Sequence, residues 1–308
     1  MVPFSLLIKK NMISIIVSTY KPENFRLFEN NIKETIGDIL YEIVKIDNPS
    51  LMGLCEAYNK GIALAKYPYL CFSHDDVKMI TPEWGEYLVN VFKQNKDVGL
   101  VGIAGCRYKA WVPSGWFSPV STFNSRANLA QCYPDGSKSN FIRIDQDNAK
   151  NGVICVDGCW FSTTASIAKE TMFDEKTFRG YHFYDADFSF NISLRYRIIV
   201  DPGIFLEHYS VGATDINWLK DTFRFHYKWR RKLPSSLIKM SRTGRARNEY
   251  RVFRYLLQLT SQHNSCWGKT FRILYSPTYM KMVGLKRWCL SNRWLLGAYV
   301  RKIKRALS

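Results

Sequence analysis

Residues 51–77 read LMGLCEAYNKGIALAKYPYLCFSHDDV, and this stretch decides the fold. Small residues at helical spacing predict a helix over about 53–66, and Tyr69–Phe72 is an apolar run typical of a buried strand. That strand runs directly into the motif Ser-His-Asp-Asp at 73–76. Open α/β folds bind ligands at the carboxyl edge of the sheet, so acidic residues there indicate a site for a metal ion and a diphosphate.

The sequence before this stretch also alternates strand and helix. Met12–Tyr20 and Glu42–Ile46 are apolar or β-branched runs that predict strands, and a helix is expected between them at about 23–36. The order strand, helix, strand, helix, strand predicts a parallel sheet. Further along the chain, the expected elements are strands at 153–161, 198–200 and 204–206 and a helix at 184–195.

These residues resemble the family 2 glycosyltransferases of the GT-A fold over about residues 12–212. The matching features, in chain order, are Ser14-Ile15-Ile16-Val17, Asp47-Asn48, Gly53-x3-Ala57-x-Asn59-x-Gly61-Ile62 and His74-Asp75-Asp76. The resemblance implies an α/β, Rossmann-like fold with a mostly parallel sheet flanked by helices. It also implies a catalytic domain at 1–214, followed by a basic helical appendage at 215–308.

The resemblance implies a divalent cation, Mn²⁺ or Mg²⁺, on the diphosphate of the donor. Asp76 matches the metal ligand, and His208 matches a third ligand found in several GT-A enzymes, although a lone His is more often structural. His74 stands where the usual Asp-x-Asp motif has its first Asp, as in a branch with His-x-Asp, and it favours Mn²⁺ weakly. His74 and Asp75 remain open as contacts to ribose, water or metal, or as residues that only end the strand.

The donor implied by the resemblance is a UDP- or dTDP-sugar. Asp47 matches an Asp that hydrogen-bonds the uracil or thymine ring, with Thr19 and Tyr20 lining the base pocket. An Asx turn before Pro49 is the alternative for Asp47 or Asn48. Gly158 is expected beneath the two sugars, where a side chain would block the pocket. The other donor-side positions of the family pattern are Asn48, Gly53 and Asn59.

The catalytic base implied by the resemblance is Asp185. Tyr184-Asp185-Ala186-Asp187 resembles the start of the family's acceptor helix, with Tyr184 in place of a Glu. One carboxylate that takes the acceptor proton, with a metal on the leaving diphosphate, suffices for an inverting displacement. Asp187 would orient its neighbours. The alternative for both acids is the preference of a helix's first turn for negative charge.

The acceptor side is expected to involve tryptophans. Residues 104–152 are predicted to form an insertion or lid beside the acceptor cleft, with a hairpin turn at Asp135-Gly136. Trp111 and Trp116 in this segment could stack on sugar rings or anchor the loop to the core. Trp160 is a candidate wall of the pocket, and a role in the core alone is equally consistent with the pattern.

The excess positive charge is confined to the last third of the chain. Residues 215–308 hold 22 Lys or Arg against 3 Asp or Glu, whereas residues 1–214 hold 22 against 23. Predicted helices at 215–232, 248–262 and 292–307 mix aromatic residues or Leu with basic ones, which suits an anionic membrane surface. The alternatives are a helical cap with a solvated basic face and a nucleic-acid partner, which no recognisable motif supports.

These features predict an inverting, metal-dependent glycosyltransferase that extends a surface glycan carried on a lipid, such as lipopolysaccharide, O-antigen or capsule. The sequence has no run of 18 apolar residues, so no membrane span is predicted. Phe4–Ile8 is too short for the apolar region of a signal peptide. Eight Cys without a Cys-x-x-Cys pair suit reduced thiols. We therefore expect a cytoplasmic protein, peripheral on the inner face of the cell membrane. The alternative is a degenerate GT-A fold that binds glycan or membrane, since His74 and Tyr184 replace acidic residues.

Overall fold

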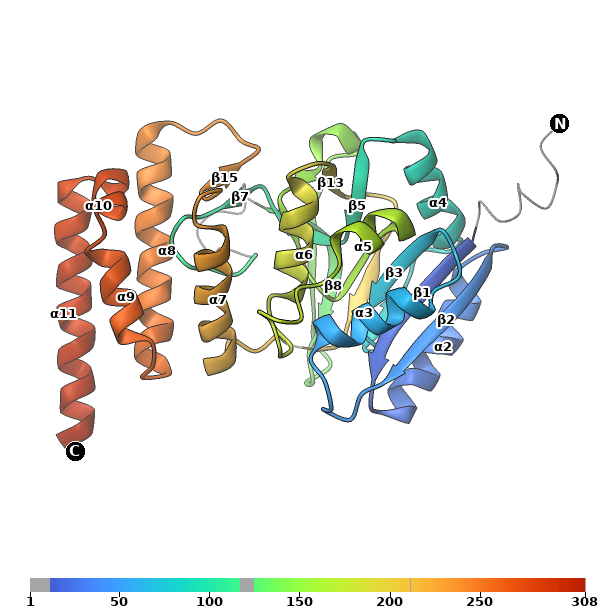
Figure 1. Cartoon of the computed structure of the whole chain (residues 1–308), viewed down its shortest axis with the longest axis horizontal. Coiled ribbons are helices and arrows are strands. Elements are labelled where there is room, and N and C mark those ends of the chain that lie inside the picture. The colour runs from blue at the N-terminus through green and yellow to red at the C-terminus, as the bar shows by residue number, and fades with distance from the viewer. Residues whose placement is uncertain (1–11, 117–124, 211, 308) are drawn as a thin grey trace. The chain divides into compact units, whose positions relative to one another are not determined.

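The computed structural model describes residues 12–116, 125–210 and 212–307 (Figure 1). Phe4–Ile8, considered above as a signal peptide, lies outside these residues. Contacts between Cα atoms divide the chain into two compact units. The first unit takes its described residues from 1–107 and 125–212, and the second takes them from 108–124 and 213–308.

A seven-stranded mixed sheet with the order β10-β13-β5-β12-β3-β1-β2 forms the centre of the first unit. β1 (Met12–Thr19) pairs in parallel with both β2 (Leu40–Asp47) and β3 (Tyr69–Ser73), as the sequence predicts. The first half of the sheet is therefore the expected parallel arrangement, with the carboxyl ends of three strands at one edge.

The other half of this sheet is mixed rather than parallel. β12 (Trp160–Thr164) lies antiparallel between β3 and β5 (Val98–Gly102). β13 (Arg197–Val200) is parallel to β5, and β10 (Gly152–Val153) is antiparallel at the edge. An α/β fold is confirmed, but the sheet is only partly parallel.

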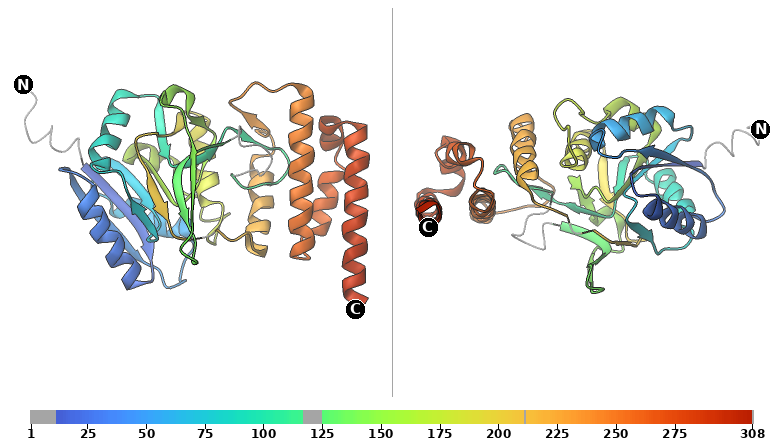
Figure 2. Two further views of the ribbon diagram at one scale, coloured as in Figure 1. Left: turned by 180° about the vertical axis from the view of Figure 1, so that it is seen from behind. Right: turned by 90° about the horizontal axis from the view of Figure 1, so that it is seen from below.

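Helices cover both faces of the seven-stranded sheet (Figures 1 and 2). α2 (Pro22–Thr35) and α4 (Trp84–Gln94) lie on one face. The opposite face carries α3 (Leu54–Leu64), α5 (Ala165–Thr171) and α6 (Tyr184–Ser193).

Small residues allow α3 to lie close to the sheet. A Cβ atom at Gly61 would come within 2.2 Å of Ile16 Cγ2 on β1, so only glycine permits this approach. The spacing of small residues that predicts this helix also determines how closely the helix packs against the sheet.

A second sheet in the same unit brings Val77, the last residue of the 51–77 stretch, beside His208, which lies near the end of the unit in sequence. Its path is β11-β6-β8-β14-β4, and β9 pairs with β8. The strands are β4 (Val77–Met79), β6 (Ala104–Cys106), β8 (Ser125–Cys132), β9 (Lys138–Arg143), β11 (Cys155–Val156) and β14 (Leu206–His208). β4 pairs antiparallel with β14, with Val77 opposite His208. This register places the residue before β4, Asp76, beside the last residue of β14.

Three predicted elements of this unit differ from the structure. The stretch 153–161 is not one strand, because it divides among β10, β11 and β12, which belong to two sheets. The strand predicted at 204–206 lies two residues later, as β14. The hairpin at Asp135-Gly136 is present, but 104–152 is no single insertion, since β8 is an inner strand of the second sheet and 108–116 belong to the second unit.

The second unit is helical. Its helices are α7 (Ile216–Trp229), α8 (Arg242–Gln262), α9 (Trp267–Leu274), α10 (Pro277–Val283) and α11 (Leu285–Leu307), and β7 (Tyr108–Lys109) pairs with β15 (Ser235–Ser236). Its core contains buried apolar side chains of α8, α9, α10 and α11, among them Phe253, Leu256, Leu274, Tyr279 and Leu295.

Local capping explains helix starts that the sequence pattern places too late or misses. α8 begins at 242 rather than 248, because the Ser241 side chain accepts a hydrogen bond from Gly244 N. α10 begins at Pro277 after a Ser276 cap, and neither α9 nor α10 is predicted. Within the described ranges, no helix has the length and hydropathy needed to cross a membrane.

Candidate active site

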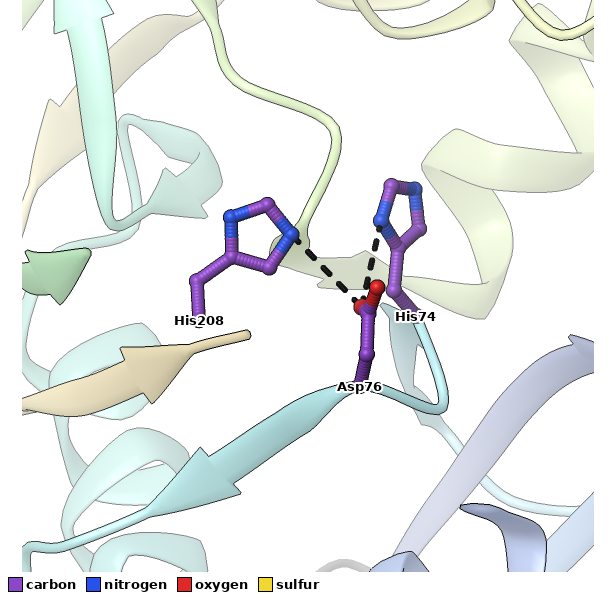
Figure 3. A group of neighbouring side chains, drawn as sticks. All are labelled: His74, Asp76 and His208. Carbon is purple, nitrogen blue, oxygen red and sulfur yellow. Dashed lines mark ion pairs between the residues drawn. The ribbon is translucent and has the colours of Figure 1, made fainter. Parts of the chain in front are cut away.

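Three side chains form a compact group that could hold a metal ion: His74, Asp76 and His208 (Figure 3). Each offers one ligand atom, and these atoms lie within 4.8 Å of one another. His74 Nδ1 is 3.8 Å and His208 Nε2 is 3.5 Å from the same oxygen, Asp76 Oδ1. The turn from β3 to β4 supplies two members and the end of β14 supplies the third, as predicted for Asp76 and His208.

Two ligand atoms of this group fit a divalent cation. Asp76 Oδ1 and His208 Nε2 are buried, and apart from the contacts within this group at 3.5 and 3.8 Å neither has a polar partner among the described residues. Buried polar atoms without partners cost free energy, so such a pair is unusual in a site that binds nothing. Although burial opposes ionisation, the neighbouring imidazoles of His208 and His74 hold the pKa of Asp76 below its usual range. One carboxylate and two imidazoles suit Mn²⁺ better than Mg²⁺.

Gln131 on β8 orients the imidazole of His208. Its Nε2 donates to the backbone oxygens of His208 (3.0 Å) and Ser210 (2.7 Å), which turns its Oε1 toward His208 Nδ1 at 3.3 Å. A proton on Nδ1 then leaves the lone pair of Nε2 facing Asp76, the tautomer that a metal ligand requires. Sequence reasoning missed Gln131, because its contact depends on the pairing of β8 with β14.

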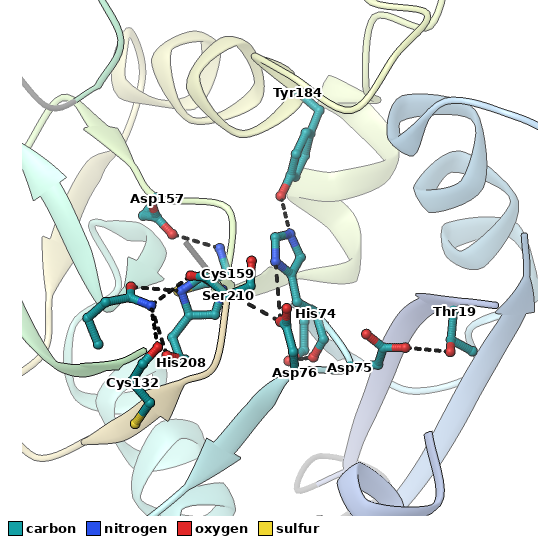
Figure 4. A network of polar contacts seen from close by, with 12 residues as sticks. Thr19, His74, Asp75, Asp76, Cys132, Asp157, Cys159, Tyr184, His208 and Ser210 are labelled. Atoms are coloured by element: carbon teal, nitrogen blue, oxygen red, sulfur yellow. Dashed lines mark hydrogen bonds and ion pairs between the residues drawn. The ribbon is translucent and has the colours of Figure 1, made fainter. Parts of the chain in front are cut away.

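Tyr184 holds the second imidazole. Its hydroxyl lies 2.6 Å from His74 Nε2, on the side of the ring opposite Asp76 (Figure 4). Burial lowers the pKa of His74 and raises the pKa of Tyr184, so both groups are neutral near pH 7. Tyr184 stands where the family pattern has a Glu, and here it acts as a partner of His74.

Gly158 is required at this place by Tyr184. A Cβ atom at Gly158 would lie 2.0 Å from the Tyr184 hydroxyl. The sequence predicts that Gly158 leaves room for the sugars, but in the structure the Tyr184 side chain occupies the space that a side chain at this position would need. Contact of Gly158 with a donor sugar stays a prediction.

Asp185, in the first turn of α6, has the properties of a general base. Burial raises its pKa to about 7, and the charge of Asp157 adds to this rise, although backbone hydrogen bonds, including one from Gly158, oppose it. A carboxyl group with this pKa is a stronger base than an exposed one and is half ionised at neutral pH.

Asp157 is an acidic residue of the site that sequence reasoning overlooked. It lies between β11 and β12, and its carboxylate accepts a hydrogen bond from Cys159 N at 2.9 Å (Figure 4). Its charge acts on Asp185, His74 and His208. An Asp inside the apolar run 153–161, directly before Gly158, is the signal that could have found it.

The predicted base pocket lies at the carboxyl ends of β1 and β2. Tyr20 is 62% exposed, and Asp47 is exposed and pairs only with Lys45 at 2.7 Å among the described residues. Thr19 Oγ1 donates to Asp75 Oδ2 at 2.6 Å, so Asp75 points away from the group formed by His74, Asp76 and His208 (Figure 4). Asp75 is thus no member of the metal group.

Asn48 organises the turn after β2. Its backbone N–H donates to Thr19 O at 2.8 Å. Its side-chain oxygen accepts from the N–H groups of Leu51 and Met52, and its amide nitrogen donates to Met52 O. This is the turn considered as the alternative in the sequence, and it fixes the loop that leads into α3.

Gly53 and Asn59 fasten α3 to the loop before α6. A Cβ atom at Gly53 would lie 2.4 Å from Arg179 O, so the two backbones touch. The Asn59 amide donates to Phe173 O and Glu175 Oε2 and accepts from Phe173 N. Its hydrogen-bonding capacity is therefore used within the protein, and donor binding by either residue stays a prediction.

The predicted acceptor-side residues do not converge in the first unit. Trp160 is 1% exposed and lies edge-on to Trp84, with ring centroids 6.0 Å apart, which agrees with the core role that the sequence left open. Asp187 is 3% exposed within α6, which agrees with a role in supporting the start of that helix. Trp111 and Trp116 belong to the second unit.

Known proteins resemble this chain in family and in fold. The model of the glycosyltransferase-like family matches residues 8–224. The crystal structure of GalNAc-T7 with UDP, GalNAc and Mn²⁺ is similar with a TM-score of 0.51 at 9% identity, over 88% of this chain and 57% of that one. The chain thus spans little more than half the length of that protein, and the likeness extends to the fold alone.

A crystal structure of S. aureus TarS, residues 1–349, gives a TM-score of 0.45 at 10% identity, over 96% of this chain and 92% of that one. No curated protein matches the sequence. The family model covers more than half of the chain and includes every member of the metal group. The predicted resemblance and the GT-A-like fold are confirmed, and the chain belongs to the glycosyltransferase-like family.

Proposed function

We propose that the first unit is an inverting, metal-dependent glycosyltransferase that moves a sugar from a UDP- or dTDP-sugar to an acceptor hydroxyl. One observation carries the proposal: a group of His74, Asp76 and His208 with two orphaned ligand atoms, coupled through the charge of Asp157 to a carboxyl of raised pKa, Asp185. The crystal structure of GalNAc-T7, which is similar in fold, contains UDP and Mn²⁺, which supports the same ligands here.

The chemistry assigned to the chain's own residues is simple. A cation held by the three ligands would stabilise the negative charge of the departing diphosphate. Asp185 takes the proton of the acceptor hydroxyl as the hydroxyl oxygen bonds to the anomeric carbon and the diphosphate leaves from the opposite face. A single displacement inverts the anomeric centre, so no covalent intermediate with the protein forms.

The nucleotide base is proposed to bind at the ends of β1 and β2. Asp47 is exposed, and its only ion pair among the described residues is to the partly exposed Lys45, so it could accept a hydrogen bond from the imide N–H of uracil or thymine. Tyr20 offers an exposed ring beside it. This pairing would favour UDP or dTDP over CDP, because N3 of cytosine carries no proton and would present a lone pair to the carboxylate.

The acceptor is proposed to be a lipid-linked surface glycan, and the protein to work at the inner face of the cell membrane. The support is the strongly basic second unit, whose helices carry both cations and exposed aromatic or aliphatic side chains. Trp111 and Trp116 remain candidates for contact with sugar rings.

Calorimetric titration of UDP, dTDP, GDP and CDP, with and without Mn²⁺, tests the nucleotide and the metal together. We expect Mn²⁺-dependent binding of UDP or dTDP that Asp76→Asn abolishes. Asp38→Asn is the matched control, because it removes one negative charge at an exposed position and no ligand atom of the metal group. Failure of all four nucleotides to bind would reject the proposal.

Turnover separates the enzyme from a degenerate binding module. With the nucleotide identified, release of that nucleotide from UDP- or dTDP-sugars is followed over time in the wild type and in Asp185→Asn. Slow hydrolysis that the substitution removes supports catalysis. Tight nucleotide binding without any turnover, even with polyprenyl-linked acceptors, would favour the binding module.

A further inference from the structure

The second unit contains a pocket of its own, with a volume of about 450 Å³. It is lined by α7, α9 and the loop that follows β7. Trp111, Pro113, Phe223 and Ile273 form its apolar surface. Four cationic side chains also line it, namely Arg224, Arg230, Lys269 and Arg272. A cavity of this size can enclose a small organic ligand.

Three of the four cations of this pocket have no negative partner among the described residues. The second unit has three side-chain carboxylates, and each has a local partner. Asp215 accepts from Trp218 N, Asp221 pairs with Arg224, and buried Glu249 accepts from Tyr108 Oη and two backbone N–H groups. Across the described residues, Arg230, Lys269 and Arg272 make no ion pair. Three neighbouring cations without counter-charge favour an anionic ligand.

Aromatic rings hold two of these cations in position. Lys269 Nζ lies 5.5 Å from the ring centroid of Phe223, and the Arg230 guanidinium carbon lies 4.5 Å from that of Tyr227. Such contacts order the long side chains. Arg230 Nη1 also donates to Tyr227 O at 3.3 Å, and the remaining N–H donors are available for a ligand. Lys269 and Arg272 are both exposed and can therefore meet it from solvent.

The apolar wall is fixed before any ligand arrives. Glu249 accepts hydrogen bonds from Trp111 N and Val112 N, each at 2.9 Å. Buried Lys109 donates from the other side of the loop to Ser114 O and Gly115 O. Two buried charged groups thus pin the backbone that presents Trp111 and Pro113, and a pre-organised wall reduces the entropy lost on binding.

We infer that this pocket binds a phosphoryl headgroup joined to an apolar chain, the chemistry of an anionic lipid. The cations suit the phosphate, and the apolar surface in the same cavity suits the first part of the chain rather than a fully hydrated ion. Exposed apolar side chains on α10 and α11, such as Met280, Leu285 and Leu296, favour a lipid over a nucleic-acid backbone. The inference gives the proposed membrane contact a defined ligand site and does not depend on sugar transfer.

Calorimetry with the full chain and dihexanoyl phosphatidic acid below its micellar concentration tests the inference. We expect saturable binding at one site, about tenfold or more tighter than that of inorganic phosphate or dihexanoyl phosphatidylcholine. Equal affinity for inorganic phosphate would overturn the lipid assignment in favour of a plain oxyanion site. Displacement of the lipid by a short single-stranded RNA at similar concentration would overturn it in favour of nucleic acid.

Paired substitutions locate the binding. Lys269→Gln with Arg272→Gln should weaken phosphatidic acid binding about tenfold or more, since two charge-assisted hydrogen bonds are lost. Lys281→Gln with Lys286→Gln removes the same charge from exposed positions on α10 and α11 and should change the affinity by less than about twofold. Equal losses in the two variants would mean a diffuse electrostatic effect and reject the pocket.

The same proteins are then compared on phosphatidylcholine vesicles that contain phosphatidic acid, where only the pocket variant should lose most of its binding. UDP titration of each variant reports on the first unit independently. A variant that fails to bind lipid yet binds nucleotide normally therefore separates this inference from the proposed transferase.

Discussion

The hydroxyl of Tyr184 occupies the space where a side chain at position 158 would lie, since a Cβ atom on Gly158 would approach it to 2.0 Å. That hydroxyl is also 2.6 Å from His74 Nε2. Gly158 is thereby linked, through Tyr184, to the orientation of a metal-group imidazole. The contact gives His74, which replaces the first Asp of the motif, a defined orientation toward Asp76.

Tyr184→Phe should weaken Mn²⁺ binding by about tenfold, because the loss of an outer partner of a metal-binding His typically has this effect. The change removes one hydroxyl from a buried ring, so the fold is retained. Gly158→Ala should weaken binding further, since it displaces the whole ring. Calorimetric Mn²⁺ titration measures both, and an unaltered affinity in Tyr184→Phe would show that the contact with His74 is unimportant.

Gln131→Met should also reduce Mn²⁺ affinity by about tenfold or more, because Met keeps the volume of Gln but offers no oxygen to His208 Nδ1. The imidazole would then be free to place its proton on Nε2. ¹⁵N chemical shifts of the His208 ring report the tautomer directly. If the ring keeps its proton on Nδ1 in the variant, the assigned role of Gln131 is wrong.

As the pH rises, the ionisation of Asp185 should lower the stability of the protein and raise its activity. Its folded pKa is about 7 against 3.8 when unperturbed, so the folded state holds the proton more tightly. The contribution of this group to stability is complete below its pKa in the unfolded state, and it is lost as the pH rises from that value through about 7. Sugar transfer requires the ionised carboxylate, so kcat/KM should rise over the same range.

Without metal, the free energy of unfolding of the wild type, relative to Asp185→Asn, should fall by about 2–3 kcal/mol between about pH 5 and pH 8. Urea unfolding at several pH values measures this difference. Asp38→Asn, which removes an exposed carboxylate, is the control and should follow the wild type. Parallel curves for wild type and Asp185→Asn would mean that the carboxyl titrates normally.

The sequence predicts the metal group because two of its members lie beside strands whose order is readable. β3 is a short apolar run that ends before His74, and His208 ends the last strand of the unit. Parallel crossovers bring the end of β3 to the carboxyl edge of the first sheet, whereas β14 belongs to the second sheet. The antiparallel register of β4 with β14, which brings Asp76 beside His208, comes from strand pairing and is visible only in the structure.

Side chains whose roles depend on long-range packing could not be predicted in this way. The sequence leaves Trp160 open between a pocket wall and a core residue, and the structure shows that β12 is an inner strand covered on both faces, so Trp160 and Phe161 are both buried. Tyr184 and Gln131 act through contacts 110 and 77 residues away along the chain. No local pattern in the sequence reports such contacts.

Glu249 is a further case, because a lone acid in a basic helix looks like a solvated residue. It is fully buried and accepts hydrogen bonds from Tyr108 Oη at 2.5 Å and from two backbone N–H groups at 2.9 Å. Glu249→Gln replaces one of its oxygens by an N–H donor that faces other donors. The substitution should therefore cost about 2–3 kcal/mol or more of stability.

Tyr108→Phe removes only one of these bonds and should cost about 1 kcal/mol. Denaturant unfolding followed by tryptophan fluorescence compares the two variants. Because Glu249 also holds the backbone of Trp111, Glu249→Gln should weaken phosphatidic acid binding under conditions where the variant remains folded, whereas Tyr108→Phe should not. A cost for Glu249→Gln no larger than that for Tyr108→Phe would mean that the backbone hydrogen bonds of Glu249 contribute little, and that the loop from 108 to 116 is held chiefly by Lys109 and by packing.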